Sequence, residues 1–347
     1  MQLKKTPTGT SILPAVGRVQ DLADKTGELR SVLSADNSET KPAGPLGYDS
    51  QPAVTVQLPV NLIEGFEIQA RLGEGSMGVV YRAKNLATKQ IVAIKILYAY
   101  MTSGEAHIRR FQEEANMALN LDHPNLVKVF QLGKSGPNLY IAMEFVDGMN
   151  LHELLVKEGS LSEATVAAIG MCVASALYYA WEKEKLIHRD IKPGNLLIGN
   201  SGILKVCDLG IAKRLDAKSG QLTHTGVTLG SPHYIAPEQA KGEKDIDVRV
   251  DIYALGATLY HAVTGQTVHN CESEYGLMIK HATEPVKDPR TIKPDLSDKF
   301  AVLLMKMLEL DRSRRIQDWF KVYETLEEIQ KVPVDDKVSL KVQSPAQ

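Results

Sequence analysis

The chain has 347 residues, of which 44% are hydrophobic and 24% are charged. This balance is typical of a folded globular protein and excludes a disordered or disulfide-dependent one. Forty Lys and Arg against 42 Asp and Glu give a net charge of −2, so no overall positive field attracts nucleic acid, and we expect no nucleic-acid partner. Three widely spaced cysteines, Cys172, Cys207 and Cys271, favour a reducing compartment, the cytoplasm.

The first 60 residues are rich in Ser, Thr, Pro, Gly and Asp, and Tyr48 is their only aromatic residue. Such a stretch cannot bury enough apolar surface to offset the entropy lost on ordering, so we expect a disordered polar leader over residues 1–60. It also lacks the apolar core and the cleavage site of a secretory signal.

The character of the chain changes at Phe66, where strand-like runs such as VVYRAKN and IVAIKIL begin. After about Asn150, apolar residues recur at helical spacing, as in LHELLVKEG, DIYALGATLYHAV and FAVLLMKMLEL. The pattern predicts an α+β chain in which a small β-rich lobe precedes a larger, mainly α lobe. Residues 332–347 are expected to form a polar tail.

Residues 164–181, ATVAAIGMCVASALYYAW, carry no charge over 18 positions, which is the lower limit for a membrane-spanning helix. The alanines, Gly170, Ser175 and two tyrosines make the stretch only weakly apolar. A membrane span and a buried core helix both fit the length, and the weak hydropathy favours the core helix. We therefore expect no membrane span.

A glycine-rich turn lies in the first strand-like region, with the pattern G-x-G-x-x-G-x-V at residues 73–80. Residues without Cβ let backbone N–H groups approach phosphate oxygens closely. A dinucleotide-binding turn would continue as a helix, whereas Val79, Val80 and Tyr81 continue as a strand. The pattern favours a hairpin folded over a nucleotide, with a plain glycine hairpin as the alternative.

A single lysine, Lys95, lies in the otherwise apolar strand VAIK. An unpaired ammonium group there would be costly to bury, so Lys95 needs an anionic partner. Nucleotide phosphates and a carboxylate from the following helix would serve, with Glu114 as the best candidate and Glu113 as the next. The alternative is a lysine whose end reaches solvent from the end of a strand.

Two carboxylates and an amide follow at fixed spacing in HRDIKPGN, residues 188–195, and in DLG, residues 208–210. Asp190 can orient a hydroxyl group or accept its proton, and Lys192 can contact a transferring phosphate. Asn195 and Asp208 supply the hard oxygen ligands that Mg²⁺ prefers. An isolated Asp or Asn is usually a turn former, but this order and spacing favour phosphoryl transfer.

Taken together, these motifs resemble those of the eukaryotic-like (Hanks-type) protein kinases over residues 66–331, in which APE at 236–238 would close the activation segment. The Lys that follows HRD resembles the serine/threonine branch, and the YIAPEQA run resembles bacterial members. The resemblance implies a bilobal protein-kinase fold whose small lobe has one main helix and whose larger lobe has residues 164–181 as its central helix. It also implies a kinase domain over residues 61–331.

Within that domain, the resemblance implies an N-lobe over about 66–143, a hinge over 144–149 and a C-lobe over 150–331. Met143 would lie at the back of the adenine pocket, and the hinge backbone would bind adenine. The ATP-binding residues implied are Leu72, Gly73, Glu74, Gly75, Ser76, Met77, Gly78, Val80, Ala93, Lys95, Glu144, Val146, Asn150, Asn195 and Asp208, with Asn150 near the ribose. Asn195 and Asp208 would hold Mg²⁺ or Mn²⁺, and Asp190, Lys192, Lys95 and Glu114 would act in catalysis.

Structural pairings also follow from the resemblance: Glu238 would pair with Arg315, and Asp251 would anchor the loop that carries Asp190. Cys207 would face the nucleotide, either as an inert buried thiol or as one that a thiol-reactive ligand can label. Leu209 replaces the usual Phe and keeps an apolar side chain there. All the expected catalytic positions are filled, which argues against a catalytically silent scaffold.

The segment QLTHTGVTLGSPHYIAPEQ contains Thr223 and Thr225, which we expect to be phosphorylated. A phosphothreonine could pair with Arg189 beside Asp190, and with Lys213, and so order the loop for a protein substrate. The alternative is a flexible loop with incidental hydroxyl groups. We therefore expect a serine/threonine kinase that phosphorylates proteins and itself, through a transient homodimer in trans. Its alternatives are a silent pseudokinase and a small-molecule phosphotransferase.

Overall fold

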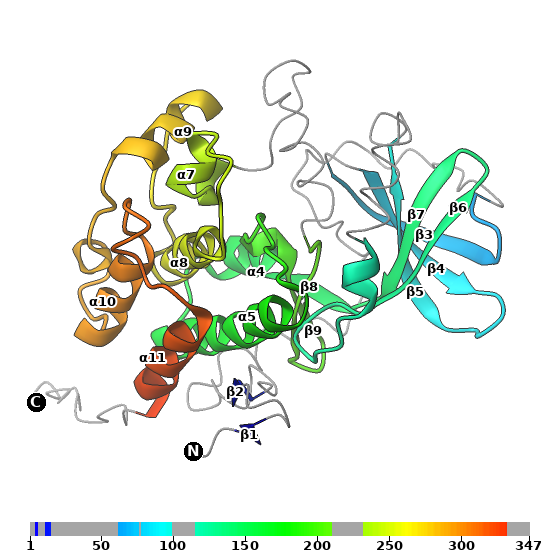
Figure 1. The fold of residues 1–347 in the computed structure, drawn as a ribbon, viewed down its shortest axis with the longest axis horizontal. Helices are drawn as coiled ribbons and strands as arrows, with labels where there is room; N and C mark the ends of the chain where they lie inside the picture. The colour runs from blue at the N-terminus through cyan, green and yellow to red at the C-terminus, as the bar shows by residue number, and fades with distance from the viewer. Residues whose placement is uncertain are drawn as a thin grey trace, which may run out of the picture.

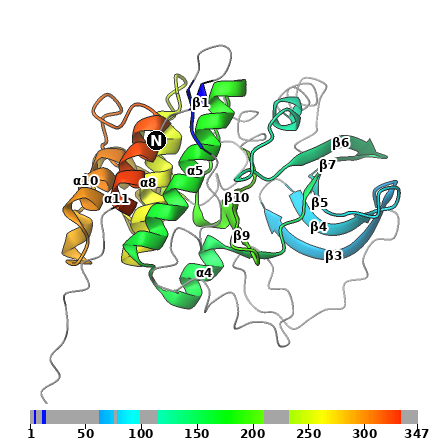
Figure 2. The same cartoon turned by 90° about the horizontal axis from the view of Figure 1, so that it is seen from below.

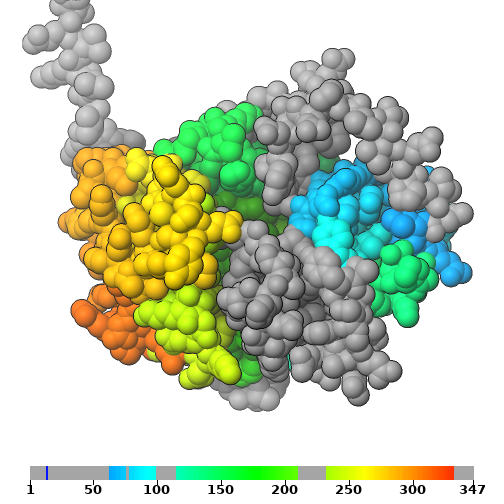
Figure 3. Space-filling view, turned by 90° about the horizontal axis from the view of Figure 1, so that it is seen from above, coloured from blue at the N-terminus to red at the C-terminus, as the bar shows by residue number. Residues whose placement is uncertain are grey.

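The computed structural model describes residues 4–5, 11–14, 62–75, 78–98, 115–209 and 232–331. A β-sheet lobe and a helical lobe lie side by side (Figure 1). In the space-filling view the blue and cyan residues of the sheet lobe lie at the opposite end of the molecule from the yellow and orange residues of the helical lobe (Figure 3). The α+β bilobal fold predicted from the sequence is confirmed.

The N-lobe is built on an antiparallel sheet with the strand order β3-β4-β5-β7-β6. Its strands are β3 Phe66–Gly75, β4 Gly78–Asn85, β5 Ile91–Leu97, β6 Val129–Ser135 and β7 Asn138–Glu144. β5 is buried along most of its length, as its apolar run predicts. Residues 115–119, the described end of the helix that follows β5, are helical.

The C-lobe begins with β8 Gly148–Asn150, which pairs with β9 Leu196–Gly199, and β9 pairs in turn with β10 Leu204–Val206. β8 therefore belongs to the C-lobe sheet, and only residues 145–147 of the expected hinge lie between the two sheets. The helices are α4 Leu151–Glu158, α5 Glu163–Glu184, α7 Pro237–Ala240, α8 Arg249–Thr264, α9 Glu274–Thr283, α10 Asp298–Met307 and α11 Trp319–Lys331.

The two lobes are also joined away from the hinge. The amide of Val127 donates to the carbonyl of Val206 at 2.9 Å, and the amide of Val206 donates to the carbonyl of Asn125 at 2.9 Å. The side-chain amide of Asn125 donates to the carbonyl of Leu204 at 2.9 Å. The segment that enters β6 of the N-lobe is thus hydrogen-bonded to β10 of the C-lobe.

α5 runs through the centre of the C-lobe, beside α8 and α11 (Figures 1 and 2). A Cβ at Gly170 would lie 2.8 Å from Leu326 and 3.0 Å from Leu259, so the glycine permits the close packing of these helices. Within the described ranges, α5 alone is long and apolar enough to cross a membrane, and 78% of its apolar window is buried inside the protein. Burial on this scale is that of a core helix, as predicted.

The N-terminal segment differs in part from the disordered leader that we expected over residues 1–60. Lys4–Lys5 and Ser11–Ile12 form a small antiparallel pair, β1 and β2, and Leu13 is only 4% exposed. The prediction rested on the average composition of the stretch, which does not show that Leu13 packs against the C-lobe. The other residues of the expected leader, and the tail from 332, lie outside the described ranges.

Buried histidines should make the stability of the C-lobe depend on pH. His281 of α9 is fully buried, and its Nδ1 lies 3.0 Å from the hydroxyl of Tyr253. Burial, and to a smaller extent the nearby His269, lower the pKa of His281 from 6.5 to about 3. The folded protein therefore keeps His281 neutral where the unfolded chain binds a proton.

We expect the contribution of His281 to the free energy of unfolding to be fully present above pH 6.5 and to fall as the pH drops from about 6.5 towards 3. At pH 5, the loss of unfolding free energy that is due to His281 is about 2 kcal/mol. Urea unfolding at pH 7.5 and pH 5 measures the loss, and His281→Gln should reduce it. The exposed His152, replaced by Gln, is the control. An equal loss in His281→Gln and in the wild type would contradict the assignment.

Candidate active site

The glycine-rich segment forms a β-hairpin, in which Gly75 of β3 lies opposite Gly78 of β4. β4 continues through Val79 and Val80, so the dinucleotide-binding alternative, which requires a helix, does not apply. A Cβ on Gly78 would lie 2.0 Å from the carbonyl oxygen of Ile96, so this position requires glycine. Gly73 and Glu74 lie in β3, whereas Ser76 and Met77 are outside the described residues.

Three other expected nucleotide contacts lie on this sheet. Leu72 and Val80 are partly buried against the main hydrophobic cluster, and Ala93 is 7% exposed. In the sheet register Val80 lies opposite Lys95, and Ala93 lies opposite Met143. The strands therefore place small and branched apolar residues around the lysine.

Lys95 extends from β5 to Asp208, and its Nζ lies 2.7 Å from Oδ1 of that residue. The Lys95 side chain is only 12% exposed, so the alternative in which its end reaches solvent is wrong. Burial opposes the charge of each group, but the mutual attraction outweighs it: the pKa of Lys95 is raised and the pKa of Asp208 is lowered. Both groups are charged at neutral pH. The expected partner Glu114 lies outside the described residues.

The loop that follows α5 gathers three candidate side chains. Nζ of Lys192 lies 3.1 Å from Oδ2 of Asp190. The Asn195 amide donates to the backbone carbonyl of Asp190 at 2.7 Å and to its Oδ2 at 3.1 Å. Since its nitrogen is engaged, the side-chain oxygen of Asn195 is the atom available to a cation. The loop therefore fixes a carboxylate between a lysine and an amide.

Asp251 of α8 is hydrogen-bonded to the backbone of this loop. Its two carboxylate oxygens accept the backbone amides of His188 and Arg189, each at 2.6 Å. Arg189 has a φ of 65°, a left-handed conformation that the two bonds help to hold. Burial raises the pKa of Asp251 to about 7, although the two amide bonds favour its charged form.

His188 links the loop to the segment that carries Asp208. Its Nδ1 accepts the amide of Asp190 at 3.3 Å, so Nε2 carries the proton of the neutral ring and donates to the carbonyl of Cys207 at 2.9 Å. The amide of Cys207 donates to the carbonyl of Asn195 at 3.0 Å. Asp190, Asn195 and Asp208 are thereby held on one hydrogen-bonded frame.

Comparison with known proteins agrees with this geometry. The family model described as "Protein kinase domain" matches residues 66–329, more than half of the chain. The chain belongs to the protein kinase family. Its kinase domain is 38% identical over 268 residues to the probable serine/threonine-protein kinase CPE1738 of Clostridium perfringens, a match that covers 77% of this chain and 38% of that protein.

Other relatives are also bacterial. Serine/threonine-protein kinase PrkC of Bacillus subtilis is 36% identical, over 76% of this chain and 39% of its own. The crystal structure of the Mycobacterium tuberculosis PknI kinase domain is 27% identical with a TM-score of 0.64, and the match covers 80% of this chain and all of that one. The chain thus spans about two fifths of the length of these curated relatives. The similarity to bacterial Hanks-type kinases expected from the sequence is confirmed.

The hinge of the kinase domain is tied to both lobes by Glu144. Its amide donates to the carbonyl of Lys128 at 2.8 Å, and its Oε2 lies 2.9 Å from Nζ of Lys205 in β10. Val146 packs against the main hydrophobic cluster. The sequence analysis missed the Glu144–Lys205 ion pair, because nothing in the spacing brings these residues together.

Asn150 caps α4. Its side-chain oxygen accepts the amide of Glu153 at 2.9 Å, and the Glu153 carboxylate accepts the amide of Asn150 at 2.9 Å. The spacing N-x-x-E ahead of an apolar helix is a signal that could have predicted this cap. The proximity of Asn150 to a ribose remains a prediction.

Cys207 and Asp208 directly follow β10 at the site. Burial raises the pKa of the Cys207 thiol well above its usual range, and the nearby Asp208 raises it further. A thiol that stays protonated is a poor nucleophile, so the structure favours the inert-thiol alternative. Leu209 is 5% exposed, in keeping with the apolar side chain expected there. Residues 210–231, which include Thr223 and Thr225, lie outside the described ranges.

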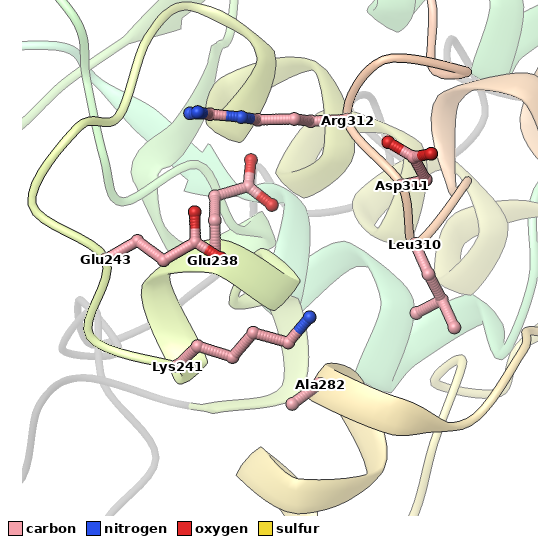
Figure 4. Close-up of a pocket in the computed structure, with 7 residues that line it drawn as sticks. All are labelled: Glu238, Lys241, Glu243, Ala282, Leu310, Asp311 and Arg312. Carbon is pink, nitrogen blue, oxygen red and sulfur yellow. The ribbon is translucent and has the colours of Figure 1, made fainter.

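Glu238 of α7 and Arg315 form a buried, two-pronged ion pair, with N···O distances of 2.7 and 3.0 Å. Their side chains are 4% and 0% exposed. Beside the pair lies a pocket of about 430 Å³, lined by Glu238, Lys241, Glu243, Ala282, Leu310, Asp311 and Arg312 (Figure 4). The acidic and basic groups face each other across this pocket, and it includes none of the candidate catalytic residues.

Proposed function

We propose that this chain is a serine/threonine kinase that transfers the γ-phosphate of Mg²⁺-ATP to hydroxyl groups of proteins. The observation that carries the proposal is the convergence of Lys95, Asp190, Asn195 and Asp208 on one frame. A silent scaffold would not need an ionised Asp208 beside a charged lysine. The active-site roles below belong to this proposal.

Asn195 and Asp208 fit a magnesium ion, because an amide oxygen and an ionised carboxylate are hard oxygen donors. The described ranges contain no cluster of three or more His, Cys, Asp or Glu side chains able to hold a metal. This agrees with Mg²⁺, which is commonly held by one or two protein oxygens together with nucleotide phosphates. When bound, the ion would neutralise charge on the phosphates. Mn²⁺ has the same donor preference.

The protein groups would then divide the work of transfer. Lys95 would bind the phosphates, and Asp190 would orient the substrate hydroxyl and accept its proton. Lys192, 3.1 Å from Asp190, would keep that carboxylate in place and contact the phosphoryl group as it moves. The glycine hairpin would cover the nucleotide with backbone N–H groups.

Incubation with γ-labelled ATP, Mg²⁺ and a Ser- and Thr-containing protein tests the function. Label on Ser or Thr of the protein is the expected result. Absence of transfer, with ATP bound, would favour the pseudokinase alternative. Transfer to small alcohols but not to protein would favour a small-molecule phosphotransferase. The cysteines Cys172, Cys207 and Cys271 are free thiols, which supports a cytoplasmic location as part of the proposal.

Autophosphorylation at Thr223 and Thr225, in trans through a transient homodimer, belongs to the same proposal. Mass spectrometry after incubation with Mg²⁺-ATP should find phosphate on both residues. The double variant Thr223→Ala/Thr225→Ala should lose activity about tenfold or more, because it removes charge-assisted hydrogen bonds worth about 1.5 kcal/mol or more. Thr228→Ala is the matched control. A double variant as active as the wild type would contradict the switch.

A further inference from the structure

The N-terminal segment ends on the C-lobe. Leu13, 4% exposed, belongs to the same hydrophobic cluster as the buried residues of α5. Oγ of Ser175, in α5, donates to the backbone carbonyl of Pro14 at 2.8 Å. Figure 1 places β1 and β2 beside α5, and Figure 2 places β1 beside the same helix. An apolar anchor and a polar one thus hold residues 13–14 on the same helix.

The polar anchor continues into the segment that leads to β6. Nδ1 of His123 accepts the amide of Asn125 at 3.1 Å, so in the neutral ring Nε2 carries the proton. That nitrogen lies 3.2 Å from Oγ of Ser175, to which it donates. Burial and, to a smaller extent, Lys205 lower the pKa of His123 to about 4, against a smaller opposing effect of Asp122, so the neutral ring that this direction needs is present at pH 7.

The direction of the bonds is therefore fixed along the whole chain of contacts. The Asn125 amide donates to His123, His123 donates to Ser175, and Ser175 donates to Pro14. Asn125 is also bonded to β10 through the carbonyl of Leu204 and the amide of Val206. β10 ends two residues before Asp208.

The ring of His123 also packs against a second residue of α5. It lies 5.3 Å, centroid to centroid, from the ring of Tyr179, one helical turn after Ser175 in α5. The Tyr179 hydroxyl accepts the amide of Asp122 at 3.2 Å. We call Asp122, His123, Ser175 and Tyr179 the α5 docking surface.

We propose that residues 11–14 dock in cis on the α5 docking surface and hold residues 120–127 in place. The occupant of this surface is the N-terminal segment itself. Its Leu13 belongs to the apolar cluster, and its Pro14 carbonyl accepts the hydroxyl of Ser175, a side chain that is buried in α5. Residues 120–127 connect the helix expected to carry Glu114 to β6. Resting on the proposed kinase function, we infer that undocking weakens phosphotransfer.

Hydrogen–deuterium exchange of the full chain tests the docking without reference to activity. Leu13→Asp should place a charge in the apolar cluster and release the segment, which speeds exchange of the amides at 120–127. Ser175→Ala removes the donor to Pro14 and also the acceptor of the His123 proton, so it should speed exchange in the same place through both bonds. Val156→Asp, at a 74% exposed position on α4, is the matched control and should leave exchange at 120–127 unchanged.

A peptide of residues 1–16 added to Leu13→Asp should restore the protection. Millimolar amounts are needed, since a tethered segment has an effective concentration of about that order. The same peptide with Leu13→Asp should have no effect. Unchanged exchange at 120–127 in Leu13→Asp and Ser175→Ala overturns the docking. If Leu13→Asp unfolds, the smaller change Leu13→Ala, tested with the same two peptides, decides.

Activity provides the second measurement. Leu13→Asp should lower kcat/KM for ATP by roughly 2- to 30-fold, the usual range for a coupling through a packed network. Faster exchange with kcat/KM equal to the wild type would overturn the link to catalysis and leave the docking intact. A wild-type chain without phosphotransfer would count against the proposed function alone, because the exchange results stand by themselves.

Discussion

Replacement of Lys95 by Met, or of Asp190 by Ala, is expected to lower phosphotransfer by roughly 10²–10⁴-fold. Lys95→Met keeps the length of the side chain in β5 but removes the cation that pairs with Asp208. Asp190→Ala removes the carboxylate held between Lys192 and Asn195. Each change deletes a group assigned to the phosphates or to the hydroxyl proton, and neither deletes a large part of the core.

Single-turnover and steady-state assays of both variants measure the loss, with circular dichroism and thermal unfolding to check that the fold persists. Two surface changes serve as controls: Lys134→Met on the exposed part of β6 and Asp245→Ala, whose side chain is 96% exposed. Turnover close to that of the wild type in Lys95→Met or Asp190→Ala would refute the assignment of the site.

The second large effect is expected from Arg315→Met. This variant leaves the carboxylate of Glu238 buried without its cation, which typically costs about 3–5 kcal/mol of stability. The guanidinium also donates to the backbone carbonyls of Arg249 at 2.8 Å and Glu309 at 3.1 Å, so these acceptors lose partners as well. Urea unfolding of the variant and the wild type at pH 7.5 measures the difference.

Two comparisons sharpen this test. Arg290→Met breaks solvent-exposed ion pairs with Asp288 and Asp298 and should cost about 1 kcal/mol or less. Adding Glu238→Gln to Arg315→Met removes the uncompensated charge and should recover part of the loss. Equal losses for Arg315→Met and Arg290→Met would show that the buried pair contributes no more than a surface one.

The sequence predicted the features that depend on local patterns. The glycines at 73–78 and the valines after them required a hairpin, and the apolar run of β5 required a buried strand around Lys95. The weak hydropathy of residues 164–181 was that of a core helix. In each case the prediction depends on a few neighbouring residues, whose periodicity and backbone preferences determine the secondary structure.

The contacts that the sequence could not supply are long-range ones between ordinary residues. Leu13 and Ser175 are far apart in the chain, and no spacing rule connects them. The same holds for Glu144 and Lys205. Lys95 was expected to need a carboxylate, and the one it meets in the described residues is Asp208, which had been assigned to the metal. Such pairings depend on how distant segments pack together, and the composition of a segment does not show this packing.

The bonds of residues 125–127 to β10 give the lobes a second point of attachment besides the hinge at 145–147. A body held at two points can turn only about the line that joins them. The two lobes should therefore turn relative to each other about one axis, with little twist or sliding. The lobes would then close on a nucleotide by the same motion each time, and the Lys95–Asp208 contact would break and form as the lobes turn.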